Sequence, residues 1–409
     1  MTRRTLEYAC GVLLVGLLAG VAGAATTWLI HFVEHLTYHY SFGTLLSGVG
    51  GSSPVRRALG PMVGGLVVGF GWWLLRRRGD VPSLSTTIVE HRPIPRWRMS
   101  IDAVLQVVLV GSGASLGREG APRQLAAALG DAGTSRWALT PRDREILLAC
   151  AAGAGLGAVY SVPLGGALFS AGIMLHSWHP RVIGTALITS SLAVAVSSPV
   201  THFEHPLSWP NPTLSYLYIG LAVVIAPLAV AVGFAFDKVM TWARPKPQLR
   251  SWTLVPAIAL AGLATGIASI WWPELPGNGR SVLTVSVNAD LTLAGAAVIL
   301  LLKPLLTATF LRAGAVGGMI TPALATGAAA GSVATLAVNH LAGTHLEVAA
   351  MSLACAAGVL AITQRAPAFA ALFVWELARP PYWLLLAFVA AAFTAHGVRL
   401  LQERRRSPT

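Results

Sequence analysis

Charged residues are scarce in this chain. Asp, Glu, Lys and Arg account for 11% of the 409 residues, whereas 55% are hydrophobic and the mean hydropathy is +0.65. A soluble globular protein carries about 25% charged residues. The shortage excludes water as the solvent for most of the surface, and it predicts an integral membrane protein.

Cysteine is rare as well. The three cysteines, Cys10, Cys150 and Cys355, lie in apolar segments and offer neither a disulfide framework nor paired metal-ligand spacing. We interpret them as small core residues and expect no metal and no cofactor.

Signals for an intramembrane enzyme are weak. The sequence contains no His-Glu-x-x-His zinc motif, and its membrane-depth serines have no obvious histidine partner. His31, His35 and His39 would stack on one helix face; we interpret them as an interfacial ladder, with an incidental metal site as the alternative. We therefore expect no enzyme, and an intramembrane enzyme is the remote alternative.

Acidic residues are outnumbered: 16 Asp and Glu face 29 Lys and Arg, for a net charge of +13. Basic chains often bind nucleic acid, but these charges flank apolar runs, so we expect no nucleic-acid partner.

The positive-inside rule places the Arg-rich segments in the cytoplasm. This predicts a multi-pass protein of the inner (plasma) membrane with both termini cytoplasmic. The segments are Arg3-Arg4, Arg76-Arg77-Arg78, Arg96 with Arg98, and Arg404-Arg405-Arg406.

Long apolar runs are what the sequence does have. Six reach or approach the ~20 residues that cross a bilayer, and we expect transmembrane helices there: 9–31, 59–75, 213–236, 253–271, 291–311 and 382–400. Five others are interrupted by Gly and Pro and predict short, tilted or re-entrant helices: 104–131, 146–175, 181–198, 314–337 and 347–375. Such breaks are tolerated at membrane depth where they are buried in protein or line a watery cavity.

The two halves of the chain repeat one another. Ala149–Gly153 recurs letter for letter as Ala354–Gly358, and each copy is followed by Pro-x-x-x-Ala-Leu-Phe, at Pro163 and at Pro367. Each copy is preceded by a Gly-rich break that ends in proline. Paired breaks in two halves point to a mid-membrane binding site in transport proteins. We expect the site to lie between them.

The first break, Gly117–Pro122, contains Arg118 and Glu119 at the start of a predicted helix. Free amides and the helix dipole at such a start favour an anion. The Glu119 carboxylate could occupy that anion site itself, and protonation would release it; the alternative is a structural carboxylate neutralised by Arg118. The second break, Gly317–Pro322, has no charge and predicts either an amide-only anion site or a tight helix contact.

These motifs resemble those of the CLC family of chloride channels and chloride/proton antiporters. Gly117–Gly120 matches the family's Gly-Lys/Arg-Glu-Gly-Pro with Ala121 in place of proline, and Gly318–Pro322 matches Gly-x-Phe-x-Pro with Ile320 in place of phenylalanine. Gly79–Pro82 aligns with Gly-Ser-Gly-Ile-Pro.

The resemblance implies an all-α integral membrane fold, an inverted repeat of many tilted and re-entrant helices. We expect one transmembrane anion-transport domain over 1–409, with pseudo-repeats at roughly 1–200 and 201–402 and no cytosolic regulatory domain. The partners implied are chloride or another small anion, protons, the lipid bilayer and a second copy in a homodimer. Glu119 is then the gating residue, and the implied anion-binding residues are Gly79, Arg118, Gly120, Ala121, Met319 and Ile320.

Three departures leave the mechanism open. Gly79 replaces the family's anion-binding serine, so no hydroxyl remains at that position. Ile173 replaces the internal glutamate through which many antiporters pass protons, and the pore tyrosine after the last span has no counterpart. A passive anion channel and a fluoride/proton antiporter therefore stay open as alternatives to proton-coupled chloride transport.

Two titratable residues lie near these departures. His176, three positions after Ile173, would share its helix face, and we weigh an interfacial histidine against a proton route. Asp80 follows Gly79; we expect it to pair with Arg76, Arg77 or Arg78, with proton acceptance as the alternative.

Overall fold

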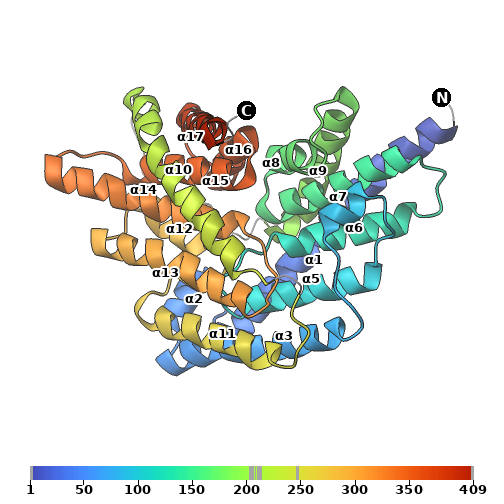
Figure 1. The fold of residues 1–409 in the computed structure, drawn as a ribbon, viewed down its shortest axis with the longest axis horizontal. Helices are drawn as coiled ribbons and strands as arrows, with labels where there is room; N and C mark the ends of the chain where they lie inside the picture. The colour runs from blue at the N-terminus through green and yellow to red at the C-terminus, as the bar shows by residue number, and fades with distance from the viewer. Residues whose placement is uncertain (1–2, 202–206, 208, 210–213, 246–247, 407–409) are drawn as a thin grey trace.

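The computed structural model describes residues 3–201, 207, 209, 214–245 and 248–406. Within these residues every regular element is a helix, which confirms the predicted fold class (Figure 1). The first half contains α1 (Arg3–Tyr38), α2 (Leu45–Gly51), α3 (Pro54–Arg76), α4 (Leu84–Val89), α5 (Arg96–Gly111), α6 (Gly120–Thr134), α7 (Pro141–Tyr160), α8 (Pro163–Leu168), the π-helical turn η1 (Phe169–Met174) and α9 (Pro180–Thr201). The second half contains α10 (Leu217–Ala243), α11 (Leu254–Trp271), α12 (Arg280–Val287), α13 (Leu293–Arg312), α14 (Ile320–Ala342), α15 (Val348–Gln364), α16 (Pro367–Ala378) and α17 (Leu384–Arg406).

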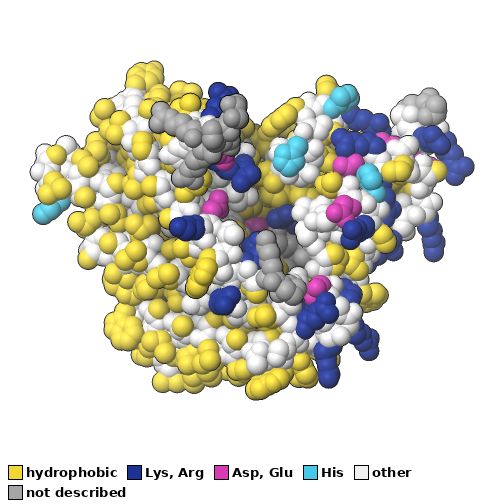
Figure 2. All heavy atoms as spheres, in the orientation of Figure 1, with side chains coloured by type: hydrophobic (Ala, Val, Ile, Leu, Met, Phe, Trp, Pro, Cys, Tyr) yellow, Lys and Arg dark blue, Asp and Glu magenta, His cyan; other side chains and the backbone are white. Residues whose placement is uncertain are grey.

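Eight described helices are long and apolar enough to cross a membrane: α1, α3, α9, α10, α11, α13, α14 and α17. Hydrophobic side chains cover most of the left and lower parts of the face in Figure 2, whereas Lys and Arg gather towards its right margin. The chain is a multi-pass membrane protein.

Two interrupted runs differ from the expectation of short or re-entrant helices. Residues 180–201 form one continuous helix, and α14 runs unbroken from Ile320 to Ala342. The glycines inside α14 permit close packing instead of a break: a Cβ on Gly327 would lie 2.7 Å from the Cα of Ala356 on α15. Most of α14 is therefore buried: 78% of its most apolar 18-residue stretch lies inside the protein.

The predicted repeat reappears in the helix ends. The C-cap residue that follows α7 is Ser161, with a φ of 54°, and the C-cap residue that follows α15 is Arg365, with a φ of 55°. A left-handed residue ends an α-helix, and proline suits the first turn of the next one. In both halves the following helix begins with the proline of the repeat, at Pro163 and Pro367.

The two halves pack against each other through these repeated segments. Helix α8 contacts α16, and the rings of Phe169 and Phe369 lie 5.7 Å apart in an edge-to-face arrangement. Glu376 on α16 accepts hydrogen bonds from the amides of Leu164 and Gly165 at the start of α8, at 2.9 and 2.6 Å. Figure 1 shows α14–α17 on the left and α6–α9 on the right, on either side of the centre.

One sequence-based expectation about a single residue is wrong, and one span-edge residue is buried. Arg76 lies at the end of α3, as expected, but it is 1% exposed, it stacks on Trp72, and its Nη1 donates to the carbonyl of Gly314 at 2.9 Å. Its Nε and Nη2 atoms are buried without a hydrogen-bond partner. Cys10 is exposed on α1, whereas Cys150 and Cys355 are buried as expected.

Candidate functional site

The two Gly-rich breaks meet at the centre of the protein. Gly117 donates its amide to the carbonyl of Gly318 at 2.9 Å, and Gly318 donates back to Gly117 at 2.8 Å. Helix α6 starts at Gly120, three residues after the bridge residue Gly117, with Glu119 as its N-cap, and α14 starts at Ile320, two residues after Gly318. The bridge therefore brings two buried helix starts together.

Glu119 lies at this junction and is fully buried, with 0% of its surface exposed. Its Oε1 atom accepts three hydrogen bonds: from the amide of Thr321 at 2.8 Å, from the Thr321 hydroxyl at 2.5 Å and from the Tyr160 hydroxyl at 3.3 Å. The amide belongs to the first turn of α14, where backbone donors and the helix dipole stabilise negative charge. The carboxylate of one repeat thus occupies the anion-attracting helix start of the other.

The second oxygen of Glu119 explains both bridge glycines. Oε2 is buried without a hydrogen-bond partner and lies against Gly117 and Gly318. A Cβ on Gly318 would overlap this oxygen and lie 2.7 Å from the carboxylate carbon. A side chain at either glycine would therefore displace the carboxylate.

Sequence reasoning missed Tyr160 and Thr321 as partners of Glu119. Tyr160, at the end of α7, also accepts from Asn278 at 3.4 Å, and the guanidinium of Arg118 stacks on its ring at 4.9 Å. The tyrosine that contacts the Glu119 carboxylate therefore comes from α7 and not from the segment after the last span. Arg118 faces Tyr160 and donates to the carbonyl of Val159 at 3.4 Å.

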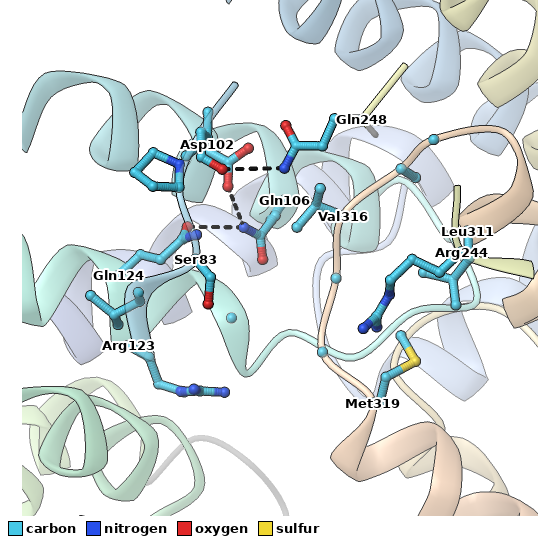
Figure 3. A pocket seen from close by; sticks show the side chains of 18 of the residues that line it. Ser83, Asp102, Gln106, Arg123, Gln124, Arg244, Gln248, Leu311, Val316 and Met319 are labelled. Carbon is cyan, nitrogen blue, oxygen red and sulfur yellow. Dashed lines mark hydrogen bonds between the residues drawn. The ribbon is translucent and has the colours of Figure 1, made fainter. Parts of the chain in front are cut away.

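A cavity of about 450 Å³ adjoins this junction (Figure 3). Asp102, Gln106 and Gln124 lie on one side of it, and Met319 and Arg244 lie on the other. Its lining residues are Arg76, Val81–Ser85, Asp102, Gln106, Gly120, Arg123, Gln124, Arg244, Pro245, Gln248, Leu249, Leu311, Gly314–Ile320 and Gln364.

The cavity brings together three of the six predicted anion-binding residues: Gly120, Met319 and Ile320. Arg118 and Ala121 are buried and lie outside its lining. Gly79 is outside it too, and its amide donates to the carbonyl of Arg76 at 3.1 Å. Gly79 has a φ of 119°, a conformation that favours glycine, so this position serves the turn after α3.

Although Gly79 carries no hydroxyl, two serines later in the chain line the cavity. Ser83 and Ser85 both line the cavity, and their hydroxyl oxygens lie 2.9 Å apart.

The two predicted proton-route residues lie away from the cavity lining. Asp80 does not pair with Arg76, Arg77 or Arg78; its partner is Arg250, at 2.9 Å. The hydrogen bond from Arg250 holds the pKa of Asp80 below its usual range. His176 is exposed at the end of η1 with a φ of 47°.

The expected ladder of three histidines is broken, because His39 lies beyond the end of α1 and His31 pairs with Glu34 at 3.1 Å. Among the described residues no group of three potential metal ligands is present. Residues 113–117 do read Gly-x-Ser-x-Gly, but the Ser115 hydroxyl contacts the Thr307 hydroxyl at 3.4 Å.

Comparison with known proteins gives matches along nearly the whole chain. The family described as "Voltage gated chloride channel" matches residues 71–399. A ClC-type chloride channel ClcB of Escherichia coli O17:K52:H18 is 28% identical over 89% of this chain and 88% of its own length. A slow cyanobacterial Cl⁻/H⁺ antiporter shares the fold with a TM-score of 0.77, 20% identity and coverage of 98% of both chains. A CLC-type fluoride/proton antiporter has a TM-score of 0.74, 19% identity and coverage of 97% of this chain and 96% of its own. With its family match spanning most of its length and its paired glycine breaks, this chain belongs to the CLC family of voltage gated chloride channels.

Proposed function

We propose that this chain moves chloride or a similar small inorganic anion across the membrane in exchange for protons, with Glu119 as the gate. The observation that carries the proposal is the position of the Glu119 carboxylate on the Thr321 amide at the start of α14. An anion and the carboxylate carry the same charge, so they compete for this helix start. Protonation removes the charge from Glu119 and lets the anion enter, which couples anion occupancy to proton binding.

Other residues contribute to the anion path in this proposal. Gly120, Met319 and Ile320 line the cavity, and Arg118 supplies positive charge beside Tyr160. We place the protein in the inner (plasma) membrane with both termini cytoplasmic, because its Arg-rich segments flank the spans. A homodimer with one path per subunit completes the proposal.

The test is anion efflux from proteoliposomes that hold the purified protein, with external pH recorded under chloride, nitrate and fluoride gradients in turn. We expect a chloride gradient to drive protons uphill. Anion efflux without proton movement would make the protein a passive channel. Proton movement driven by fluoride alone would favour a fluoride/proton antiporter, the activity named for one of the structural neighbours.

A further inference from the structure

Asp102 is a buried acid that the proposed function does not yet use. It lies on α5, is 1% exposed, and lines the cavity. Its Oδ1 accepts from the indole of Trp72 and its Oδ2 accepts from the amide of Gln106, each at 2.8 Å. An ionisable residue inside a membrane protein is costly and marks an ion or proton pathway by default.

Gln106 connects this acid to the neighbourhood of the gate. One end of its amide donates to Asp102 and also to Gln124, at 2.9 Å. The other end, Oε1, is buried without a hydrogen-bond partner and faces Gly120, the residue after Glu119. A buried acceptor left open in this way is expensive unless water reaches it. The polar wall of the cavity thus extends from Asp102 to Gly120 (Figure 3).

The cavity lining includes the glycines around Glu119, whereas the fully buried Glu119 is not itself part of the lining. Gly318 lines the cavity, and the unpartnered Oε2 of Glu119 lies against Gly318. Oε1 is engaged by Thr321, so Oε2 is the oxygen available for a proton. The cavity is therefore lined both by Asp102 and by Gly318, the residue that lies against Oε2 of Glu119.

The charges around Asp102 suit a group that alternates between two protonation states. Arg76 on α3 is the nearby cation, but its guanidinium donates to backbone carbonyls, and no ion pair with Asp102 forms among the described residues. Arg123 on α6 and Arg244 line the cavity, and Gln124 and Gln248 complete the polar surroundings. Asp80, in contrast, is held ionised by Arg250.

We propose that Asp102 is the internal proton donor and acceptor of this protein, in the role that Ile173 leaves empty. The inference rests on the proposed proton coupling. A proton leaves a carboxyl oxygen of Asp102, passes through water in the cavity and binds Oε2 of Glu119. Asp102 is left as a carboxylate and takes its next proton from solvent at the cavity mouth.

The test measures chloride and proton fluxes together in proteoliposomes that hold the full chain. Asp102→Asn keeps the shape and an acceptor for Trp72, so we expect chloride flux to stay within about twofold and proton flux to fall by about 100-fold, the scale of a lost positioned acid. Asp102→Glu should restore proton flux in part. A variant that loses both fluxes together would show a structural role and overturn the proposal.

Asp80→Asn serves as the matched carboxylate control, and we expect it to keep the wild-type ratio of protons to chloride. If Asp80→Asn loses proton flux while Asp102→Asn keeps it, the assignment is wrong. Wild-type protein that moves chloride without protons would instead refute the proposed coupling itself. The failure of the gate proposal and the failure of the Asp102 proposal therefore give different results.

Discussion

At the scale of single residues, the two oxygens of the Glu119 carboxylate have opposite surroundings. One accepts three hydrogen bonds, and the other has no partner. Glu119→Gln imitates the protonated side chain, so we predict that proton-coupled flux disappears while anion flux persists or rises. Flux measured across a pH series in proteoliposomes checks this. A pH dependence equal to that of the wild type would remove Glu119 from the gate.

The Asp80–Arg250 pair permits a prediction about pH. Arg250 lowers the pKa of Asp80, so the pair stabilises the folded state above the unfolded pKa of ~3.9, and this contribution is lost as the pH falls through the lower folded value. The side chains of Asp80 and Arg250 are 37% and 54% exposed, so water screens the pair and its contribution to stability is small.

We therefore predict that Asp80→Asn lowers the thermal stability in detergent slightly at pH 7, and that the difference from wild type shrinks below about pH 4. Thermal unfolding of both proteins over this range is the measurement. A difference that grows on acidification would contradict the assigned sign.

At the scale of elements, the Glu119 carboxylate fills the space beside the bridge between the two breaks. Gly318→Ala would place a methyl group where Glu119 Oε2 lies, and overpacking of this kind costs about 1–3 kcal/mol. We predict that Glu119 is displaced from Thr321, so that anion flux loses most of its pH dependence, as in Glu119→Gln.

Gly184→Ala is the control for that substitution. Gly184 lies in α9, and a Cβ there would meet no atom within 4 Å. Alanine in a helix is favoured over glycine by about 0.5–1 kcal/mol, so this variant should transport as the wild type does. Equal behaviour of the two alanine variants would show that the close approach at Gly318 has no functional consequence.

At the scale of the whole molecule, Glu376 ties the second half of the chain to the first. Its carboxylate accepts hydrogen bonds from the amides of Leu164 and Gly165 at the start of α8. A side-chain cap of this kind contributes about 0.5–2 kcal/mol to stability. We predict that Glu376→Gln, which keeps only one acceptor oxygen, lowers the unfolding free energy by ~1 kcal/mol. Thermal unfolding in detergent measures it, with Glu403→Gln as the control because Glu403 is half exposed and pairs within its own helix.

Much of this architecture can be predicted from the sequence pattern alone. Apolar runs mark the spans because a lipid-facing helix must be apolar and must satisfy its own backbone hydrogen bonds. The repeated Ala-Cys-Ala-Ala-Gly and proline segments predict matching helices, and α7–α8 and α15–α16 confirm them. Local pattern failed at α9 and α14. In α14 the glycines mark close packing against α15 instead of a break. In α9 the single glycine, Gly184, lies within a continuous helix and meets no neighbour.

Sequence alone also singled out Glu119, since a carboxylate between glycines at a buried helix start has few structural explanations. Its partners could not be predicted in the same way. Tyr160 lies 41 residues away and Thr321 lies 202 residues away, and neither is distinguished from the many other polar residues in apolar helices. Asp102 and Gln106 likewise become candidate site residues only through the cavity that they share with Gly120.

The sequence by itself determined that lipid surrounds this protein, that its two halves repeat and that a carboxylate lies at its centre. Hydropathy, repetition and the chemistry of a helix start are local properties, so each can be seen in the sequence. Only the tertiary structure decided which groups surround that carboxylate. The contact between the two breaks is made by backbone amides and carbonyls, which every residue except proline carries. The glycines mark the two segments, but a backbone hydrogen bond does not specify its partner, so only the packing of the two halves decides that Gly117 pairs with Gly318.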